Sequence, residues 1–207
     1  PGPEKDRLRR EVRVLVLTGL GLNCEAETEA AFRMVGARPE RVHLLELLEG
    51  TARHRLGDYP VLAFIGGFAF GDHLGAGFVF ANKIRYRLYD QLPEFIARGG
   101  LALGVCNGFQ TMTRLGVLHQ IVARYLGADG APTQDWPHNP NGSPDAIAGI
   151  CDPSGRLFGL MPHPDAFLYP FHHPDWARRR VLGTAAQEGA GLAIFRNGVD
   201  AAAAELA

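Results

Sequence analysis

The sequence predicts a single α/β domain with a mostly parallel central sheet that helices cover on both faces. Short β-branched and apolar runs alternate with helical segments through the first half of the chain, as they do around parallel sheets. Turns that contain glycine follow three of these runs, at the sheet edge where parallel folds place their ligand sites. The 207 residues are enough for one domain with a sizeable buried core.

Four strands are predicted in the first half, at residues 12–18, 42–47, 61–65 and 101–105. The first of them, VRVLVLT, is apolar and rich in β-branched residues, which is typical of a strand buried on both faces. A helix over residues 24–35 follows, with Asn23 as its N-cap, acidic residues near its start and Gly36 at its end. Further helices are predicted over residues 76–89, from Pro93 onward and over residues 107–115.

The second half of the chain has a different pattern, with short strands separated by polar loops. The segment Asp152–Gly155 (DPSG) is a strong turn signal between two apolar runs, which predicts a hairpin. Strands are expected over residues 121–125, 146–151 and 156–161, and helices over residues 175–182 and after Asn197. Because no repeat or linker divides the chain, one domain is expected over residues 1–207.

The composition excludes several classes of protein. The net charge is −1 without a basic block or acidic tail, which argues against binding to nucleic acid or a membrane surface. The charged start has no signal-peptide core, and no apolar run is long enough to span a bilayer. The three cysteines form no CxxC pair, so a disulfide framework or structural zinc site is not expected. A reducing, cytoplasmic location and no bound metal are the predictions.

The segment Gly104–Gly108 (GVCNG) has the spacing of a nucleophile elbow with cysteine at its centre. The sharp strand-to-helix turn crowds the positions two before and two after the nucleophile, so both favour glycine. The N-terminus of the following helix favours the thiolate of Cys106, and the Asn107 N–H is placed to bind an oxyanion. The alternative is a small buried cysteine in a glycine-rich turn.

A thiolate nucleophile needs a proton-transfer partner, and His163 is the best candidate. It follows a predicted strand, and the prolines on both sides of it favour extended backbone. Residues two apart then face the same way, so Asp165 can orient the imidazole. The alternative is a surface histidine beside a turn aspartate. Four other loop histidines fit a catalytic triad less well: His73, His138, His172 and His173.

The paired glycines of IGGFAFGD, at residues 65–72, let backbone N–H groups point at a ligand, although a plain strand-to-helix turn would look the same. A phosphate site is disfavoured because the sequence has no G-x-x-x-x-G-K-[ST] motif. A dinucleotide site after Gly19–Gly21 is disfavoured because Cys24 stands where that fingerprint has glycine or alanine.

Five stretches together resemble the class I glutamine amidotransferases, and they extend over most of the chain. They are TGLGLNCE (18–25), GGFAFGD (66–72), GVCNGFQ (104–110), NPNGSPDAIA (139–148) and GLMPHPD (159–165). Within this family, the chain is similar to the glutaminase subunit or domain of phosphoribosylformylglycinamidine synthase. The late segment EGAGLAIFRNG also fits.

The resemblance implies a flavodoxin-like three-layer sandwich and a glutaminase reaction. Cys106 would attack the side-chain amide of glutamine, with His163 as proton shuttle and Asp165 as its orienting carboxylate. Ammonia would leave, and water would then release glutamate from the thioester. The resemblance places the oxyanion at backbone N–H groups of Gly67, Phe68 and Asn107. It makes Gly66 and Gln110 part of the glutamine pocket.

The resemblance also implies a partner that uses the ammonia in de novo purine biosynthesis. This partner is an ATP-dependent synthetase subunit, accompanied in some members by a small third subunit. Nothing in the chain resembles the synthetase, so no cofactor is expected here, and ATP and magnesium are expected on the partner.

Two features differ from the family pattern. The family usually has glutamate in place of Asp165, and a stretch of several strands is missing near residues 118–122. These differences leave two alternatives open. One is another cysteine-elbow hydrolase of the DJ-1/protease-like type, and the other is a scaffold subunit without turnover.

Overall fold

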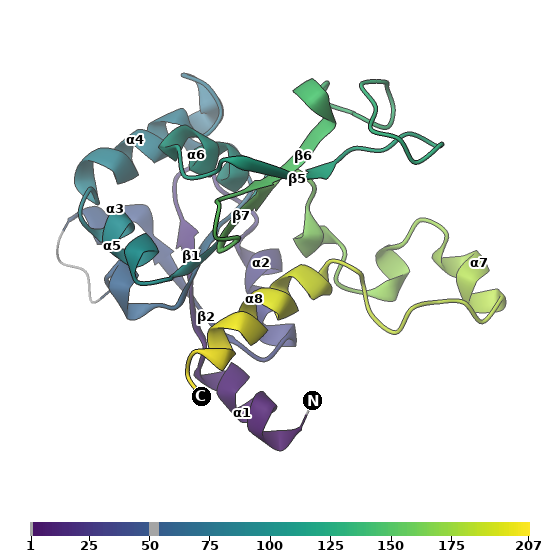
Figure 1. Ribbon diagram of the computed structural model, residues 1–207, viewed down its shortest axis with the longest axis horizontal. Coiled ribbons are helices and arrows are strands. Elements are labelled where there is room, and N and C mark those ends of the chain that lie inside the picture. The colour runs from purple at the N-terminus through teal and green to yellow at the C-terminus, as the bar shows by residue number, and fades with distance from the viewer. Residues whose placement is uncertain (1, 50–53) are drawn as a thin grey trace.

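The computed structural model describes residues 2–49 and 54–207, which form one twisted sheet between layers of helices (Figure 1). The sheet has the strand order β2-β1-β3-β4-β7-β6-β5. Strands β2, β1, β3, β4 and β7 are mutually parallel, and β6 runs antiparallel to both of its neighbours. The strands are β1 (Arg13–Thr18), β2 (Arg38–His43), β3 (Val61–Phe64), β4 (Leu101–Val105), β5 (Gln120–Arg124), β6 (Ile147–Cys151) and β7 (Leu157–Leu160).

The helices lie in two layers, as the mostly parallel sheet requires. They are α1 (Pro3–Glu11), α2 (Glu25–Met34), α3 (Leu44–Leu48), α4 (Phe78–Arg87), α5 (Gln91–Ala97), α6 (Asn107–Leu115), α7 (Trp176–Val181) and α8 (Leu192–Ala204). Short 3₁₀ turns are η1 (Leu56–Asp58), η2 (Ala69–Asp72), η3 (Pro144–Ala146), η4 (Pro164–Ala166) and η5 (Pro170–His172). None of the described helices is long and apolar enough to cross a bilayer.

Strand β1 shows why the sheet must be covered on both faces. Val14 and Val16 belong to the buried cluster that also contains residues of α2 and α8. Leu15 and Leu17 point to the opposite face, into the cluster that contains residues of α4, α5 and α6. The continuous apolar run of the sequence therefore forms a strand with two buried faces, and the predicted three-layer α/β fold is confirmed.

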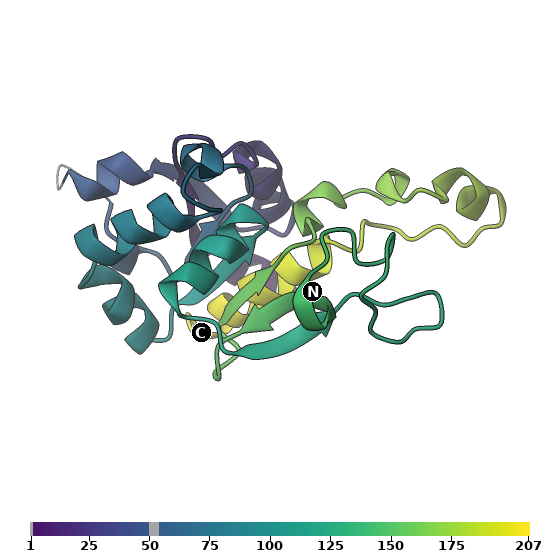
Figure 2. The same cartoon turned by 90° about the horizontal axis from the view of Figure 1, so that it is seen from above.

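Several predicted elements match the structure closely. Strand β4 and helix α6 have the predicted bounds, and the hairpin β6–β7 turns at Asp152–Gly155 as expected. Helix α1 was not expected, and α8 begins at Leu192 rather than after Asn197. Figure 2 shows that the segment between η4 and α8, which carries α7, extends away from the body of the domain.

The strand predicted over residues 42–47 is wrong, because β2 ends at His43 and helix α3 follows it. Pairing with β1 starts at Arg38, opposite Arg13, so β2 uses residues that have no apolar strand pattern. The imidazole of His43 accepts a hydrogen bond from the Leu45 N–H at 3.2 Å, and Glu46 accepts from the His43 N–H at 3.2 Å. This capping box turns the leucine-rich run into a helix.

Asn23 is not the N-cap of α2. Cys24 holds that position, and its side chain makes no capping hydrogen bond. The Asn23 N–H donates instead to the Gly66 carbonyl at 3.3 Å. This contact ties the turn after β1 to the loop after β3, and both turns lie at the carboxyl ends of their strands.

Candidate active site

Cys106 lies between the end of β4 and the start of α6 in a backbone conformation with φ 53° and ψ −109°. A non-glycine residue rarely adopts this conformation, and such strain concentrates at functional sites. The Cys106 N–H donates to the Leu160 carbonyl on β7 at 2.9 Å, and the Gln110 N–H donates to the Cys106 carbonyl at 3.0 Å. These bonds hold the cysteine at the turn, and the predicted elbow is present.

The two glycines of the elbow leave no room for side chains. A Cβ atom on Gly104 would lie 2.5 Å from the Met112 sulfur, and one on Gly108 would lie 2.0 Å from the Phe64 carbonyl oxygen. The α6 helix therefore packs directly on β3 and β4, which brings its N-terminus under Cys106. The sequence-based prediction that both positions favour glycine is confirmed.

We expect Gly108→Ala to destabilise the protein by about 1–3 kcal/mol, because the Phe64 backbone cannot move away without disturbing β3. Gly198→Ala is the matched control, since a Cβ atom there meets nothing within 4 Å in the middle of α8. That control should raise the stability by roughly 0.5–1 kcal/mol. Urea unfolding of both variants measures the difference, and equal midpoints would contradict the packing argument.

His163 and Asp165 form the predicted pair, although the 3₁₀ turn η4, and not the predicted extended backbone, brings the two side chains together. The Nδ1 atom of His163 lies 3.1 Å from Oδ1 of Asp165, which is almost fully buried at the start of η4. The Thr28 hydroxyl on α2 lies 3.5 Å from the other carboxylate oxygen, Oδ2. The aspartate side chain therefore reaches the imidazole, although the resemblance leads one to expect the longer glutamate at this position.

The surroundings of His163 favour its protonated form. The hydrogen bond to Asp165, and then the contact with the Cys106 thiol, raise the pKa of His163 to about 10 against the opposing effect of burial. The imidazole therefore pairs with the carboxylate and lies close to the nucleophile. At neutral pH it is an imidazolium, which stabilises negative charge on the neighbouring sulfur.

The raised pKa predicts how the ring titrates and how the fold responds to pH. The folded protein binds the His163 proton more tightly than an unfolded chain, whose histidine pKa is 6.5. The resulting stabilisation is complete below pH 6.5 and is lost as the pH rises through about 10. We expect the His163 ring to remain protonated at pH 8 by NMR, with His163→Gln used to assign its signal. A midpoint near 6.5 would contradict this.

The Asn107 side chain joins the elbow to the loop after β3. Its Nδ2 donates to both carboxylate oxygens of Asp72, at 3.0 and 3.1 Å. Its Oδ1 accepts from the Ala69 N–H at 3.3 Å. Asn107 is itself 1% exposed. These bonds fix the first residue of α6, whose N–H is the predicted oxyanion donor, relative to the GGFAFGD loop.

The N–H of Phe68, which is one of the predicted oxyanion donors, already makes a hydrogen bond in this structure. The Phe68 N–H donates to the Gly21 carbonyl at 2.7 Å, so this bond would have to break before Phe68 could bind an oxyanion. Among the described residues, the Gly67 N–H donates to no backbone carbonyl. Gly67 has φ 137°, a value that favours glycine. Gly67, Phe68 and Asn107 stay predicted donors, and of these Phe68 would first have to release the Gly21 carbonyl.

The two predicted pocket residues lie next to these groups. A Cβ atom on Gly66 would lie 2.7 Å from Cε1 of His163, so the bare backbone there packs against the imidazole. The side chain of Gln110, one turn into α6, accepts a hydrogen bond from Asn107 Nδ2 at 3.4 Å. Of the four rival histidines, His73, His138 and His172 are exposed.

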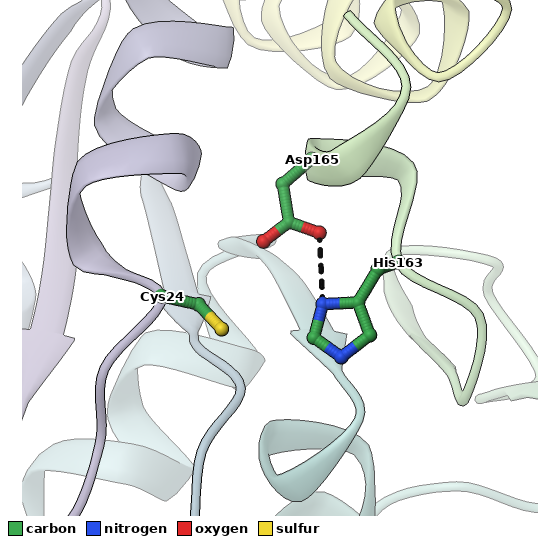
Figure 3. Close-up of side chains that lie close together, drawn as sticks. All are labelled: Cys24, His163 and Asp165. Atoms are coloured by element: carbon green, nitrogen blue, oxygen red, sulfur yellow. Dashed lines mark hydrogen bonds and ion pairs between the residues drawn. The ribbon is translucent and has the colours of Figure 1, made fainter. Parts of the chain in front are cut away.

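Cys24 lies beside this site and was not predicted there from the sequence. Its sulfur lies within 4.8 Å of ligand atoms of both His163 and Asp165, and Figure 3 shows it directed toward them. Burial and then the charge of Asp165 raise the pKa of Cys24 to about 11, so it is a neutral thiol and a poor nucleophile. The sequence signal that could have placed Cys24 here is its position shortly after the glycine-bearing turn at residues 19–21.

Comparisons with known proteins agree with this geometry. The family model described as CobB/CobQ-like glutamine amidotransferase domain matches residues 11–121 and 117–200. The "phosphoribosylformylglycinamidine synthase subunit PurQ" of Methanococcus maripaludis is 35% identical, over 82% of this chain and 88% of its own length. The protein of the same name from Dehalococcoides mccartyi is 32% identical, over 91% of this chain and 97% of its own length.

A solved structure confirms the fold. A chain from "Structure of PurLQS from Thermotoga maritima" superimposes with a TM-score of 0.60 over 84% of this chain and 97% of that chain, at 24% identity. Sequence, site and fold thus agree, and the chain belongs to the family of CobB/CobQ-like glutamine amidotransferase domains.

Proposed function

We propose that this chain is the glutaminase subunit of phosphoribosylformylglycinamidine synthase, and that it hydrolyses glutamine to glutamate and ammonia. The observation that carries the proposal is the strained Cys106 at the elbow, next to the His163–Asp165 pair. The relatives that bear this name cover most of the chain at 32–35% identity. Their shared name supports the choice of glutamine and of the pathway.

The first half of the reaction forms a thioester. The Cys106 sulfur, as the thiolate beside the His163 imidazolium, attacks the side-chain amide carbon of glutamine. The carbonyl oxygen takes the negative charge, and the N–H groups of Asn107 and Gly67 donate to it. His163 gives its proton to the amide nitrogen, the carbon–nitrogen bond breaks, and ammonia leaves.

The second half releases glutamate. His163, now neutral, removes a proton from a water molecule that attacks the thioester carbon. The carbon–sulfur bond then breaks, which restores the Cys106 thiolate and the His163 imidazolium. Asp165 keeps Nδ1 of the ring protonated throughout, so that Nε2 is the atom that exchanges protons.

In this proposal the ammonia passes to an ATP-dependent synthetase subunit, with ATP and magnesium bound there. The word "subunit" in the relatives' names supports such a partner. The proposed complex also includes a small third subunit.

We also propose that the stretch missing relative to the family lies in the connection between α6 and β5. Only residues 116–119 join these elements, and the two matched segments of the family model meet at residues 117–121. The alignment with the Dehalococcoides mccartyi relative extends over 253 positions, more than the 207 residues here. We therefore place the missing stretch at this connection, where its strands would otherwise help to close the glutamine pocket.

Ammonia release from glutamine, measured with and without the synthetase, tests the proposal. We expect weak activity alone and at least about tenfold more with the partner, since binding that completes a pocket raises the fraction of competent enzyme. Equal activity in both conditions would count against the partner. Peptide cleavage without ammonia release would favour the DJ-1/protease-like alternative. Unchanged pathway flux in a Cys106→Ala strain would favour the scaffold alternative.

A further inference from the structure

Three metal-ligating groups meet beside the proposed nucleophile, although their spacing in the sequence did not predict a metal site. They are the Cys24 sulfur, the His163 imidazole and the Asp165 carboxylate, and one ligand atom of each lies within 4.8 Å of the other two. Figure 3 shows the three side chains converging from the start of α2, from His163 just before η4 and from η4 itself. The proposed glutaminase reaction gives Cys24 no role.

We propose that these three residues form an inhibitory binding site for a zinc ion. Thiolate, imidazole and carboxylate are the ligands that zinc binds in proteins, and three of them with one open position make a common zinc site. In a tetrahedral site the ligand atoms lie about 2.0–2.3 Å from the metal and so roughly 3.5 Å from one another. Side-chain shifts of about an ångström would bring the three groups to that geometry.

The backbone around the cluster permits this approach. A Cβ atom on Gly66 would lie 3.0 Å from the Cys24 sulfur and 2.7 Å from Cε1 of His163. Because Gly66 has no side chain, the Cys24 thiol and the His163 ring can both pack against its backbone. Asp165 is almost fully buried, and the Thr28 hydroxyl lies near its Oδ2. The carboxylate is therefore held in a position from which it can bind either the His163 ring or a zinc ion.

Zinc at this site would stop the glutaminase reaction. The Asp165 oxygen and the His163 ring, which now share a hydrogen bond, would both coordinate the ion. His163 could then no longer exchange a proton with Cys106 and glutamine. Binding releases the Cys24 thiol proton and one ring proton of the His163 imidazolium to solvent, and a chelator reverses it without any redox step. The inhibition rests on the proposed function, whereas the binding does not.

Cobalt and zinc titrations of the full chain test the proposal. Cobalt(II) should give a thiolate-to-metal charge-transfer absorption in the wild type and in Cys106→Ser, and none in Cys24→Ser. Cys151→Ser, which changes a buried cysteine on β6, is the matched control and should keep the absorption. Loss of the band in Cys106→Ser, with retention in Cys24→Ser, would overturn the assignment and place the metal on the nucleophile. No band in any variant would also overturn it.

The inhibition of ammonia release by zinc is measured separately from metal binding. Cys24→Ser should keep the basal ammonia release, while the zinc concentration for half inhibition rises at least about tenfold. Unchanged zinc sensitivity in Cys24→Ser would overturn the inhibitory role. If the wild type releases no ammonia at all, the proposed function fails, but the cobalt spectra still decide whether the metal site exists.

Discussion

Cys106→Ser is expected to lower kcat for glutamine hydrolysis about 10,000-fold or more. A serine hydroxyl does not ionise beside an imidazolium, so the variant has no anionic nucleophile to attack the glutamine amide. The fold should be kept, because the substitution exchanges atoms of similar size at the partly buried elbow. Ammonia release under saturating glutamine measures the loss, and the unfolding midpoint shows that the variant is intact.

Covalent labelling gives the same prediction an independent readout. A diazo-ketone analogue of glutamine should label Cys106 alone, as peptide mass spectrometry would show. Cys151→Ser should be labelled and active like the wild type, since that thiol is buried in β6. Labelling at Cys24, or full activity of Cys106→Ser, would contradict the assignment of the nucleophile.

Asp165→Asn is expected to lower kcat roughly 1,000- to 10,000-fold with a small change in KM. The asparagine amide would present an N–H to Nδ1 of His163, which reverses the hydrogen bond now seen at 3.1 Å. The ring would then carry its proton on Nε2 and could not accept one there. The pKa of His163 should also fall, since Asp165 is the main cause of its elevation.

Two variants test whether Asp165 acts by orienting the His163 ring or only by filling space beside it. Thr28→Val removes the hydroxyl 3.5 Å from Asp165 Oδ2 and should change kcat only a few-fold, because that contact is long. Asp165→Glu keeps the acceptor and should retain much more activity than Asp165→Asn. A pH profile of kcat records the shift of the His163 titration, and equal profiles for wild type and Asp165→Asn would contradict its role.

Most of the fold could be predicted because its signals are local. The run VRVLVLT predicts a strand buried on two faces, and β1 is one. The strand predicted over residues 42–47 failed because pairing with β1, not apolarity, selects residues 38–43, and a capping box at His43 starts a helix. Apolar periodicity cannot show which strand a segment will pair with.

The sequence by itself determined the elbow and the His163–Asp165 pair. Each depends on neighbours in the chain. Glycines lie two residues either side of Cys106, and His163 and Asp165 are only two residues apart, although a 3₁₀ turn rather than the predicted extended backbone brings them together. Only the tertiary structure decided that Cys24 joins this pair and that the Phe68 N–H is held by the Gly21 carbonyl. These contacts join turns after different strands, and only the assembly of the parallel sheet brings such turns to one edge.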